Sequence, residues 1–216
     1  MEKTLAAGRL LVRFNKPHVL LSWAVYGGGL IESDTVVWYR VSSDDLEPPA
    51  SPHAFLHQKL KAESLTHGVG LLTSADLAGY TDVEKVYEKL SARAIATVGL
   101  SSALRVGDPP REILQPGTIN LLCVLSAPLS FEAHLEALSI AAEARTAAVL
   151  EAAIPSTQTS LPATGTGTDC IVMAAPREGP DSDETLCYAG KHTAAGHLIG
   201  KAVFEAVSRA IRRERD

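Results

Sequence analysis

The feature that most constrains the fold is a buried-strand pattern followed at once by a long helical pattern. Residues 118–127, "TINLLCVLSA", form a nearly continuous apolar run of strand length, as expected of a strand covered on both faces. Residues 130–154 then predict the best helix of the chain, with Ser130 as its N-cap. The apolar stripe expected on this helix consists of Phe131, Leu135, Leu138 and Ala142, resumed by Val149.

Further strand and helix patterns alternate along the chain. Strands are predicted at residues 4–14, 18–26, 35–41, 68–75, 94–100 and 169–176. The turn "NKP" indicates a hairpin between the first two. Helices are predicted at residues 53–63, at 82–92 with Thr81 as N-cap, and at 193–215 with a face of Ile199, Val203, Val207 and Ile211.

The first three predicted strands follow one another without a helix, so the chain is not a regular βαβ series. We therefore expect an α/β or α+β fold. One or two β-sheets of mixed pairing would be covered by helices in a single domain over residues 1–216.

Charge and hydropathy exclude several classes of partner. The net charge is −5 and the one basic cluster lies at the end of the last predicted helix, so no nucleic-acid partner is expected. Neither an apolar run of 18 residues nor a signal-peptide pattern occurs, which predicts a cytoplasmic protein without a membrane partner. Assembly into a homo-oligomer is compatible with the sequence. The three cysteines are widely spaced, and we expect reduced, partly buried thiols rather than a catalytic cysteine.

The loop "TGTGTD" lies directly before the predicted strand at 169–176. Its glycines allow positive φ, so backbone N–H groups could form an anion-binding nest among threonine hydroxyls. Asp169 lies where the loop becomes a strand, a position typical of site residues. The pattern is neither a P-loop nor a dinucleotide fingerprint, and a plain turn is the alternative. The candidate binding residues here are Thr164, Gly165, Thr166, Gly167 and Thr168.

A second candidate segment, "YAGKHT", precedes the last predicted helix. His192 could transfer protons near neutral pH, and Lys191 could bind an anionic or carbonyl group. A lysine at a helix N-terminus opposes the helix dipole, which favours a functional role over the alternative of a solvated helix end.

Three further residues are candidates for substrate binding. Ser22 and Gly28 belong to "SWAVYGGG", where consecutive glycines indicate either close backbone approach or a loose hairpin. Asn120 lies inside an apolar strand, so its amide needs partners and would brace a loop or face a substrate. His53 and His57 share a helix face but lack the glutamate of HExxH and an obvious third ligand, so no metal site is predicted.

Five segments in order, "GVGLLTSAD", "ATVGLSSA", "GTINLLCVLSAPLS", "ATGTGTD" and "YAGKHTAAGHLIGKAVFEAV", resemble the adenosylcobinamide amidohydrolases of corrinoid salvage. The resemblance extends from Ser22 to about Val207, and residues 32–52 depart most from the pattern. It implies cleavage of the amide between the corrin side chain and aminopropanol, giving adenosylcobyric acid and 1-amino-2-propanol. The corrinoid is then the substrate and no separate cofactor is expected.

Amide hydrolysis needs a nucleophile, donors for the oxyanion and an acid for the leaving amine. Asp169 and His192 are the candidate catalytic pair, with water activated by one of them or a threonine as the nucleophile. The alternatives to this enzyme are a non-catalytic corrinoid-binding protein and a self-processing acyl-transferring enzyme with a threonine nucleophile.

Overall fold

The computed structural model describes residues 1–216 except 7, 43, 47–50, 111–116, 178–184 and 216. The elements of the first half are β1 (Glu2–Ala6), β2 (Arg9–Ser22), β3 (Gly29–Arg40), η1 (Asp44–Leu46), α1 (Pro52–Ala62), β4 (Val69–Thr73), η2 (Leu77–Gly79), β5 (Thr81–Tyr87), β6 (Leu90–Val98) and β7 (Ala103–Leu104). Those of the second half are β8 (Ile119–Leu125), α2 (Phe131–Glu151), β9 (Gly165–Thr166), β10 (Cys170–Pro176) and α3 (Ala194–Arg215).

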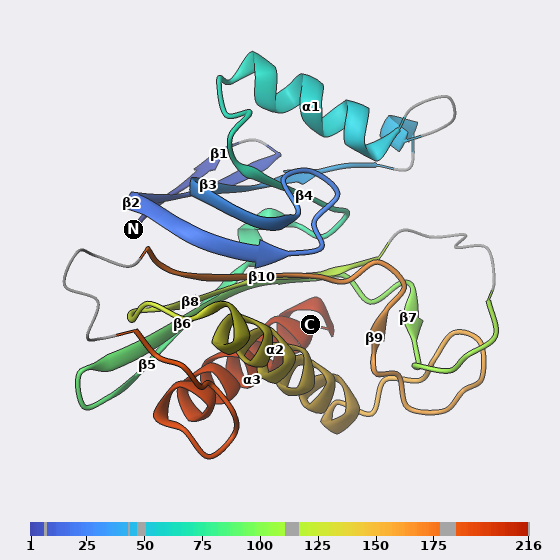
Figure 1. Cartoon of the computed structure of the whole chain (residues 1–216). Coiled ribbons are helices and arrows are strands. Elements are labelled where there is room, and N and C mark those ends of the chain that lie inside the picture. Colours follow the sequence, from blue (N-terminus) through green and yellow to red (C-terminus); the bar gives the residue numbers. More distant parts are fainter. Residues whose placement is uncertain (7, 43, 47–50, 111–116, 178–184, 216) are drawn as a thin grey trace.

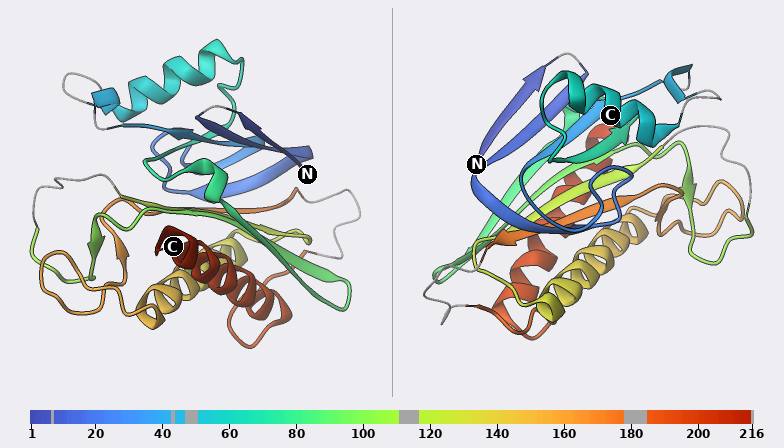
Figure 2. Two further views of the ribbon diagram at one scale, coloured as in Figure 1. Left: turned by 180° about the vertical axis from the view of Figure 1, so that it is seen from behind. Right: turned by 45° about the horizontal axis from the view of Figure 1, so that its top comes forward.

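The elements form four layers, in the order helix, sheet, sheet, helices (Figure 1). The strands follow one hydrogen-bonded path, β4-β3-β2-β10-β8-β6-β5, with β1 added beside β2. This path bends between β2 and β10, so that β1–β4 lie over β10, β8 and β6 (Figures 1 and 2). Pairing is parallel between β3 and β4 and between β8 and β10, and antiparallel elsewhere on the path. The predicted single domain with a mixed sheet covered by helices, an α+β fold, is confirmed.

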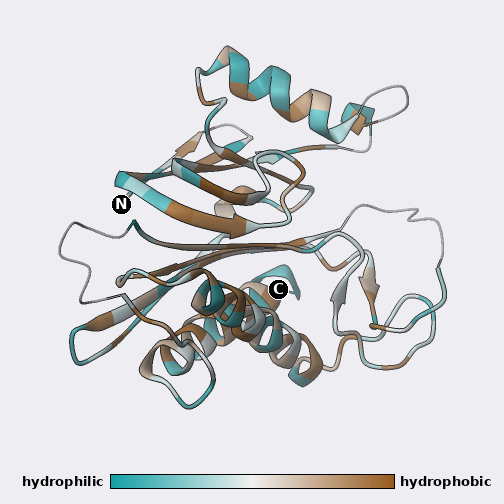
Figure 3. Ribbon diagram, in the orientation of Figure 1, coloured by the Kyte–Doolittle hydropathy of each residue, from teal (hydrophilic) through white to brown (hydrophobic). Residues whose placement is uncertain are grey.

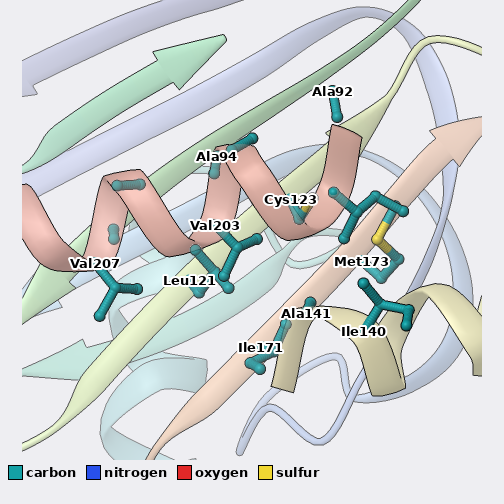
Figure 4. Packing of buried hydrophobic residues seen from close by; sticks show 14 of the residues in the cluster. Ala92, Ala94, Leu121, Cys123, Ile140, Ala141, Ile171, Met173, Val203 and Val207 are labelled. Atoms are coloured by element: carbon teal, nitrogen blue, oxygen red, sulfur yellow. The ribbon is translucent and has the colours of Figure 1, made fainter. Parts of the chain in front are cut away.

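Successive side chains of a strand point to opposite faces of the sheet and therefore belong to different hydrophobic cores. In β10, Ile171 and Met173 face α2 and α3, whereas Val172 faces the other half of the sheet. The core under α2 and α3 is rich in alanine, which lets both helices approach the strands closely (Figure 4). Accordingly, the strands at the centre of the molecule are coloured largely hydrophobic, while α1 shows a mostly hydrophilic face (Figure 3).

Two predicted elements are wrong. The hairpin at "NKP" does not form, because β2 runs through it as one strand with a register shift between Arg13 and His18. The hairpin lies earlier, between β1 and β2. The helix expected at residues 82–92 is a second hairpin, β5–β6, with the positive φ of Glu88 in its turn. Val83 is buried and Val86 is exposed, a strand alternation that the helix-favouring Glu and Lys residues concealed.

The long helix is confirmed, including a hydrogen bond from the Ala133 N–H to the Ser130 side chain, but its predicted buried stripe is partly wrong. Phe131 and Leu135 are 52% and 47% exposed. The residues of α2 that are buried are smaller on average: Ala133, His134, Ala137, Ile140, Ala141, Ala148 and Val149. The face predicted for α3 is buried as expected. Within the described residues, no helix is long and apolar enough to span a membrane.

Candidate active site

A cleft of about 630 Å³ opens where the two halves of the sheet meet at one edge. Residues that follow β2, β3 and β4 and residues that precede β8 and β10 all line the cleft, so segments next to five strands converge on it. Such an edge is a common place for a ligand site, because the strands hold the loops rigidly. The residues that line the cleft are Trp23, Val25, Val41, Ser42, Leu46, Pro52, Gly70–Ser74, Gly117, Thr118, Asn120 and 167–170.

Neutral hydrogen-bonding groups dominate the polar part of the cleft. Asn120 is 2% exposed, and its Nδ2 donates to the Leu72 carbonyl 2.6 Å away, which ties β8 to β4 across the sheet interface. Thr118 Oγ1 donates to the Thr168 carbonyl at 2.8 Å, and Thr168 Oγ1 donates to the Gly117 carbonyl at 3.2 Å. The loops before β8 and β10 are therefore fastened to each other at the cleft.

An exposed apolar edge borders the mouth of the cleft. Trp23 is 48% exposed and Val25 is 53% exposed, although both line the cleft. The Trp23 Nε1–H donates to the Asp169 carbonyl at 2.6 Å, which fixes the indole ring beside the entrance. A fixed, half-exposed aromatic ring is suited to contact a flat ligand.

The carboxylate of Asp169 is held by donors on every side. It pairs with Arg145 of α2, and both side chains are largely buried, at 7% and 15% exposure. The Ile119 N–H donates to its Oδ1 at 3.0 Å and the Thr166 N–H to its Oδ2 at 3.0 Å, and the Thr166 hydroxyl also donates to it. A carboxylate with this many partners fixes the loops around it, and most of its acceptor sites are engaged by groups of the protein.

The ion pair between Arg145 and Asp169 explains why residue 165 is a glycine. A Cβ at Gly165 would lie 2.0 Å from Arg145 Nη1 and 2.3 Å from Asp169 Oδ2, so only glycine fits above the pair. Its φ is not in the left-handed range, and the nest expected from positive φ at this glycine is therefore wrong. Thr164 is also engaged: its Oγ1 accepts from the Val106 N–H at 2.8 Å. Of the predicted loop, Gly167, Thr168 and Asp169 line the cleft.

The second candidate segment lies elsewhere. Lys191 forms an exposed ion pair with Glu143, and His192 is exposed in the loop before α3. This loop contacts α2 at Glu136 and Glu143, whereas the Asp169 loop contacts α2 at Arg145, nearer the C-terminal end of the helix (Figure 1). Neither Lys191 nor His192 lines the cleft. The fold therefore does not bring Asp169 and His192 together as a catalytic pair.

Ser22 is the last residue of β2, and Gly28 lies in the turn between β2 and β3. Ser22 is buried, and its Oγ accepts a 3.4 Å hydrogen bond from the Ala24 N–H. A Cβ on Gly28 would lie 2.4 Å from the Ala24 carbonyl oxygen, so close backbone approach requires this glycine. Neither residue lines the cleft, although the turn carries Trp23 and Val25 into it.

The cysteines and histidines offer no further site chemistry. Burial raises the pKa of the Cys170 thiol at the cleft, and of Cys123 in the helix-side core, to about 12, so neither is a ready nucleophile. Cys187 is exposed rather than partly buried. His53 and His57 pack against the ring of Tyr26. The described residues contain no group of three or more His, Cys, Asp or Glu that could hold a metal ion.

Sequence reasoning did not single out the residues that shape this site. Trp23 and Thr118 lie beside candidates that it did select, Ser22 and Asn120. Arg145 is a lone basic residue among alanines and threonine in α2, and that isolation was the available signal for a buried partner.

Comparison with known proteins places the chain in a family. A model of the family described as adenosylcobinamide amidohydrolase matches residues 2–216. An adenosylcobinamide amidohydrolase of Methanosarcina mazei is 29% identical over 165 residues, which cover 74% of each chain. An uncharacterized protein of Methanocaldococcus jannaschii is 30% identical over 161 residues, and the match covers 65% of this chain and 61%, less than two thirds, of that protein.

Among solved structures, a beta-aminopeptidase of Burkholderia sp. aligns with 94% of this chain and 78% of its own, at 15% identity and a TM-score of 0.49. A likeness at that level says nothing of this chain's chemistry. The family model, in contrast, spans every element of the fold and every loop of the cleft, and this protein belongs to the adenosylcobinamide amidohydrolase family.

Proposed function

We propose that this protein hydrolyses the amide that joins the corrin side chain of adenosylcobinamide to aminopropanol. The products are adenosylcobyric acid and 1-amino-2-propanol, and the acid returns to cobalamin synthesis in corrinoid salvage. The family match over residues 2–216 is the observation that carries this proposal. The corrinoid is the substrate, and the proposed reaction consumes only water besides it.

The cleft supports the proposal by its size and polarity. A volume of about 630 Å³ can take the amide-bearing side chain and the aminopropanol group, while the much larger corrin ring stays at the mouth. There the half-exposed Trp23 and Val25 offer an apolar surface to the edge of the ring. Among the described lining residues, Asp169 alone is charged at neutral pH, and its charge is neutralised by Arg145. An uncharged lining with hydroxyl and amide groups suits a substrate that carries many neutral amides.

In this proposal Asp169 positions the loops around the cleft, and the chemistry takes place among the hydroxyl groups between them. His192 and Lys191 lie outside the cleft, and the proposal assigns them no step.

The test is incubation of the purified protein with adenosylcobinamide and detection of both products by mass spectrometry. A Trp23→Ala variant tests the mouth of the cleft. Its KM for adenosylcobinamide should rise more than its kcat falls, because the indole ring contributes to substrate binding and not to the chemical step. Corrinoid binding without either product would instead indicate a binding protein, and the proposed activity would be wrong.

A further inference from the structure

The peptide bond between Gly117 and Thr118 lies at the wall of the cleft, and its carbonyl oxygen has two hydroxyl donors. Ser102 Oγ donates to the Gly117 carbonyl oxygen at 2.6 Å, and Thr168 Oγ1 donates to the same atom at 3.2 Å. Two donors aimed at one carbonyl oxygen form the arrangement that stabilises an oxyanion during acyl transfer.

The loop after β6 holds the same peptide in place. A Cβ at Gly117 would lie 2.6 Å from Ser101 Oγ and 2.8 Å from the Ser102 nitrogen, so this glycine is pressed against the loop after β6. The same loop also holds the next residue, because the Gly99 N–H donates to the Thr118 carbonyl at 3.0 Å. Glycine is therefore required here, and the carbonyl carbon has no side chain of its own to shield it.

The hydroxyl group of Thr118 is adjacent to this polarised carbonyl. Thr118 is 6% exposed and lines the cleft, and its Oγ1 is oriented by the 2.8 Å hydrogen bond to the Thr168 carbonyl. Asp169 fixes the next residue through the Ile119 N–H at 3.0 Å, so the buried ion pair with Arg145 holds the start of β8 in register with the loop before β10. Nucleophile, carbonyl and oxyanion donors thus share one rigid corner.

We propose that the chain cleaves itself between Gly117 and Thr118, and that Thr118, with its new α-amino group, is the nucleophile of the hydrolase. The role of Thr118 as the nucleophile of the hydrolase rests on the function proposed above, whereas the self-cleavage does not. This role assigns a catalytic group to a cleft in which the carboxylate of Asp169 is held by Arg145 and Thr166, and in which burial raises the pKa of the Cys170 thiol.

The cleavage balances with one water molecule. Thr118 Oγ1 forms a bond to the Gly117 carbonyl carbon, and the charge that develops on the carbonyl oxygen is stabilised by Ser102 and Thr168. The carbon–nitrogen bond then breaks, and the Thr118 nitrogen takes the proton that the hydroxyl releases. Water hydrolyses the resulting ester, which leaves a carboxylate on Gly117 and restores the hydroxyl of Thr118.

The product of this step is better suited to catalysis than the intact chain. An ordinary α-amino group has a pKa of about 7.7–8.0, so part of it is unprotonated near neutral pH and can accept the proton of its own hydroxyl. The hydroxyls of Ser102 and Thr168 are released from the Gly117 carbonyl and can donate to a substrate oxyanion. Thr118 would then form an ester with the corrin side chain and release aminopropanol, and water would free the acid.

The experiment follows the full-length chain without any corrinoid. Folded protein is incubated at neutral pH and examined on a denaturing gel, by intact mass spectrometry and by N-terminal sequencing. We expect fragments of residues 1–117 and 118–216, whose masses sum to the intact chain plus one water, with the second fragment beginning Thr-Ile-Asn-Leu. Thr118→Val should stay intact and Thr118→Ser should cleave. Ser102→Ala should cleave about a hundredfold more slowly, the usual cost of losing one oxyanion donor.

Thr4→Val, on the exposed strand β1, is the matched control and should cleave as the wild type does. Circular dichroism and gel filtration establish that each variant is folded. A wild-type chain that stays intact, cleavage at another bond, or cleavage of folded Thr118→Val would overturn the proposal. Cleavage without turnover of adenosylcobinamide would refute only the substrate, whereas turnover by an intact chain would refute only the processing.

Discussion

Replacing Asp169 by asparagine separates a structural role from a catalytic one. The change keeps the shape of the side chain but removes the charge that pairs with Arg145, whose side chain is only 15% exposed. The new amide nitrogen would also face donors, namely the N–H groups of Ile119 and Thr166 or the guanidinium group. Removing one partner of a buried ion pair costs about 3–5 kcal/mol, because the other charge stays buried without compensation.

We therefore expect Asp169→Asn to lower the free energy of unfolding by about 3 kcal/mol or more. For a chain of this size each kcal/mol lowers the melting temperature by about 2–4 °C, so the expected fall is about 6–12 °C. Urea unfolding and calorimetry without substrate measure it directly. In a double-mutant cycle with Arg145→Met, the two losses should be less than additive by about 1 kcal/mol or more, since both remove the same interaction.

The opposite result would identify Asp169 as a catalytic base. In that case Asp169→Asn would melt within about 2 °C of the wild type, while the turnover of the folded enzyme fell by about a hundredfold, the scale of a lost acid–base group. His192→Ala is a useful comparison, because this exposed residue lies outside the cleft and its removal should leave stability and turnover nearly unchanged.

Three further predictions concern buried groups. Gly165→Ala should lower the melting temperature and the turnover together, because its methyl group would lie within 2.3 Å of both members of the ion pair; a loss of turnover at unchanged stability, measured by thermal melts, would contradict this. Burial lowers the pKa of His134 below its ordinary value of about 6.5, so the unfolded chain binds more protons than the folded one just below that pH. Stability should therefore be complete above about pH 6.5 and fall as the pH drops from there towards the folded pKa, and His134→Gln should flatten this part of the pH profile of unfolding. A thiol reagent at pH 8 should label Cys187 rapidly and Cys123 and Cys170 only on unfolding, because burial raises the pKa of both buried thiols to about 12; labelling of all three in the folded protein, counted by mass spectrometry, would show that the core opens.

Local sequence patterns predicted the helices and strands whose formation depends mainly on residues that are neighbours in the sequence. The strand at residues 118–127, its following helix and the cap at Ser130 could be predicted, because hydrophobic periodicity and capping are properties of neighbouring residues. The face of α3 was predictable for the same reason. The hairpin β5–β6 was not, because its helix-favouring residues form strands only when β6 pairs with β8, a partner that follows later in the chain.

Some features of the candidate site could likewise be predicted from the sequence, and others only the tertiary structure could show. Glycine spacing and motif order pointed to the "TGTGTD" loop, Asn120 and the family, since these are read along the chain. Whether Asp169 accepts a proton or holds an ion pair depends on Arg145, which lies in a helix far from it in the sequence. Likewise, Thr118 lines the cleft and His192, in the loop before α3, lies outside it. Charge pairing, burial and cleft walls arise from contacts between segments distant in the sequence, and therefore only the tertiary structure could decide which candidate residues meet.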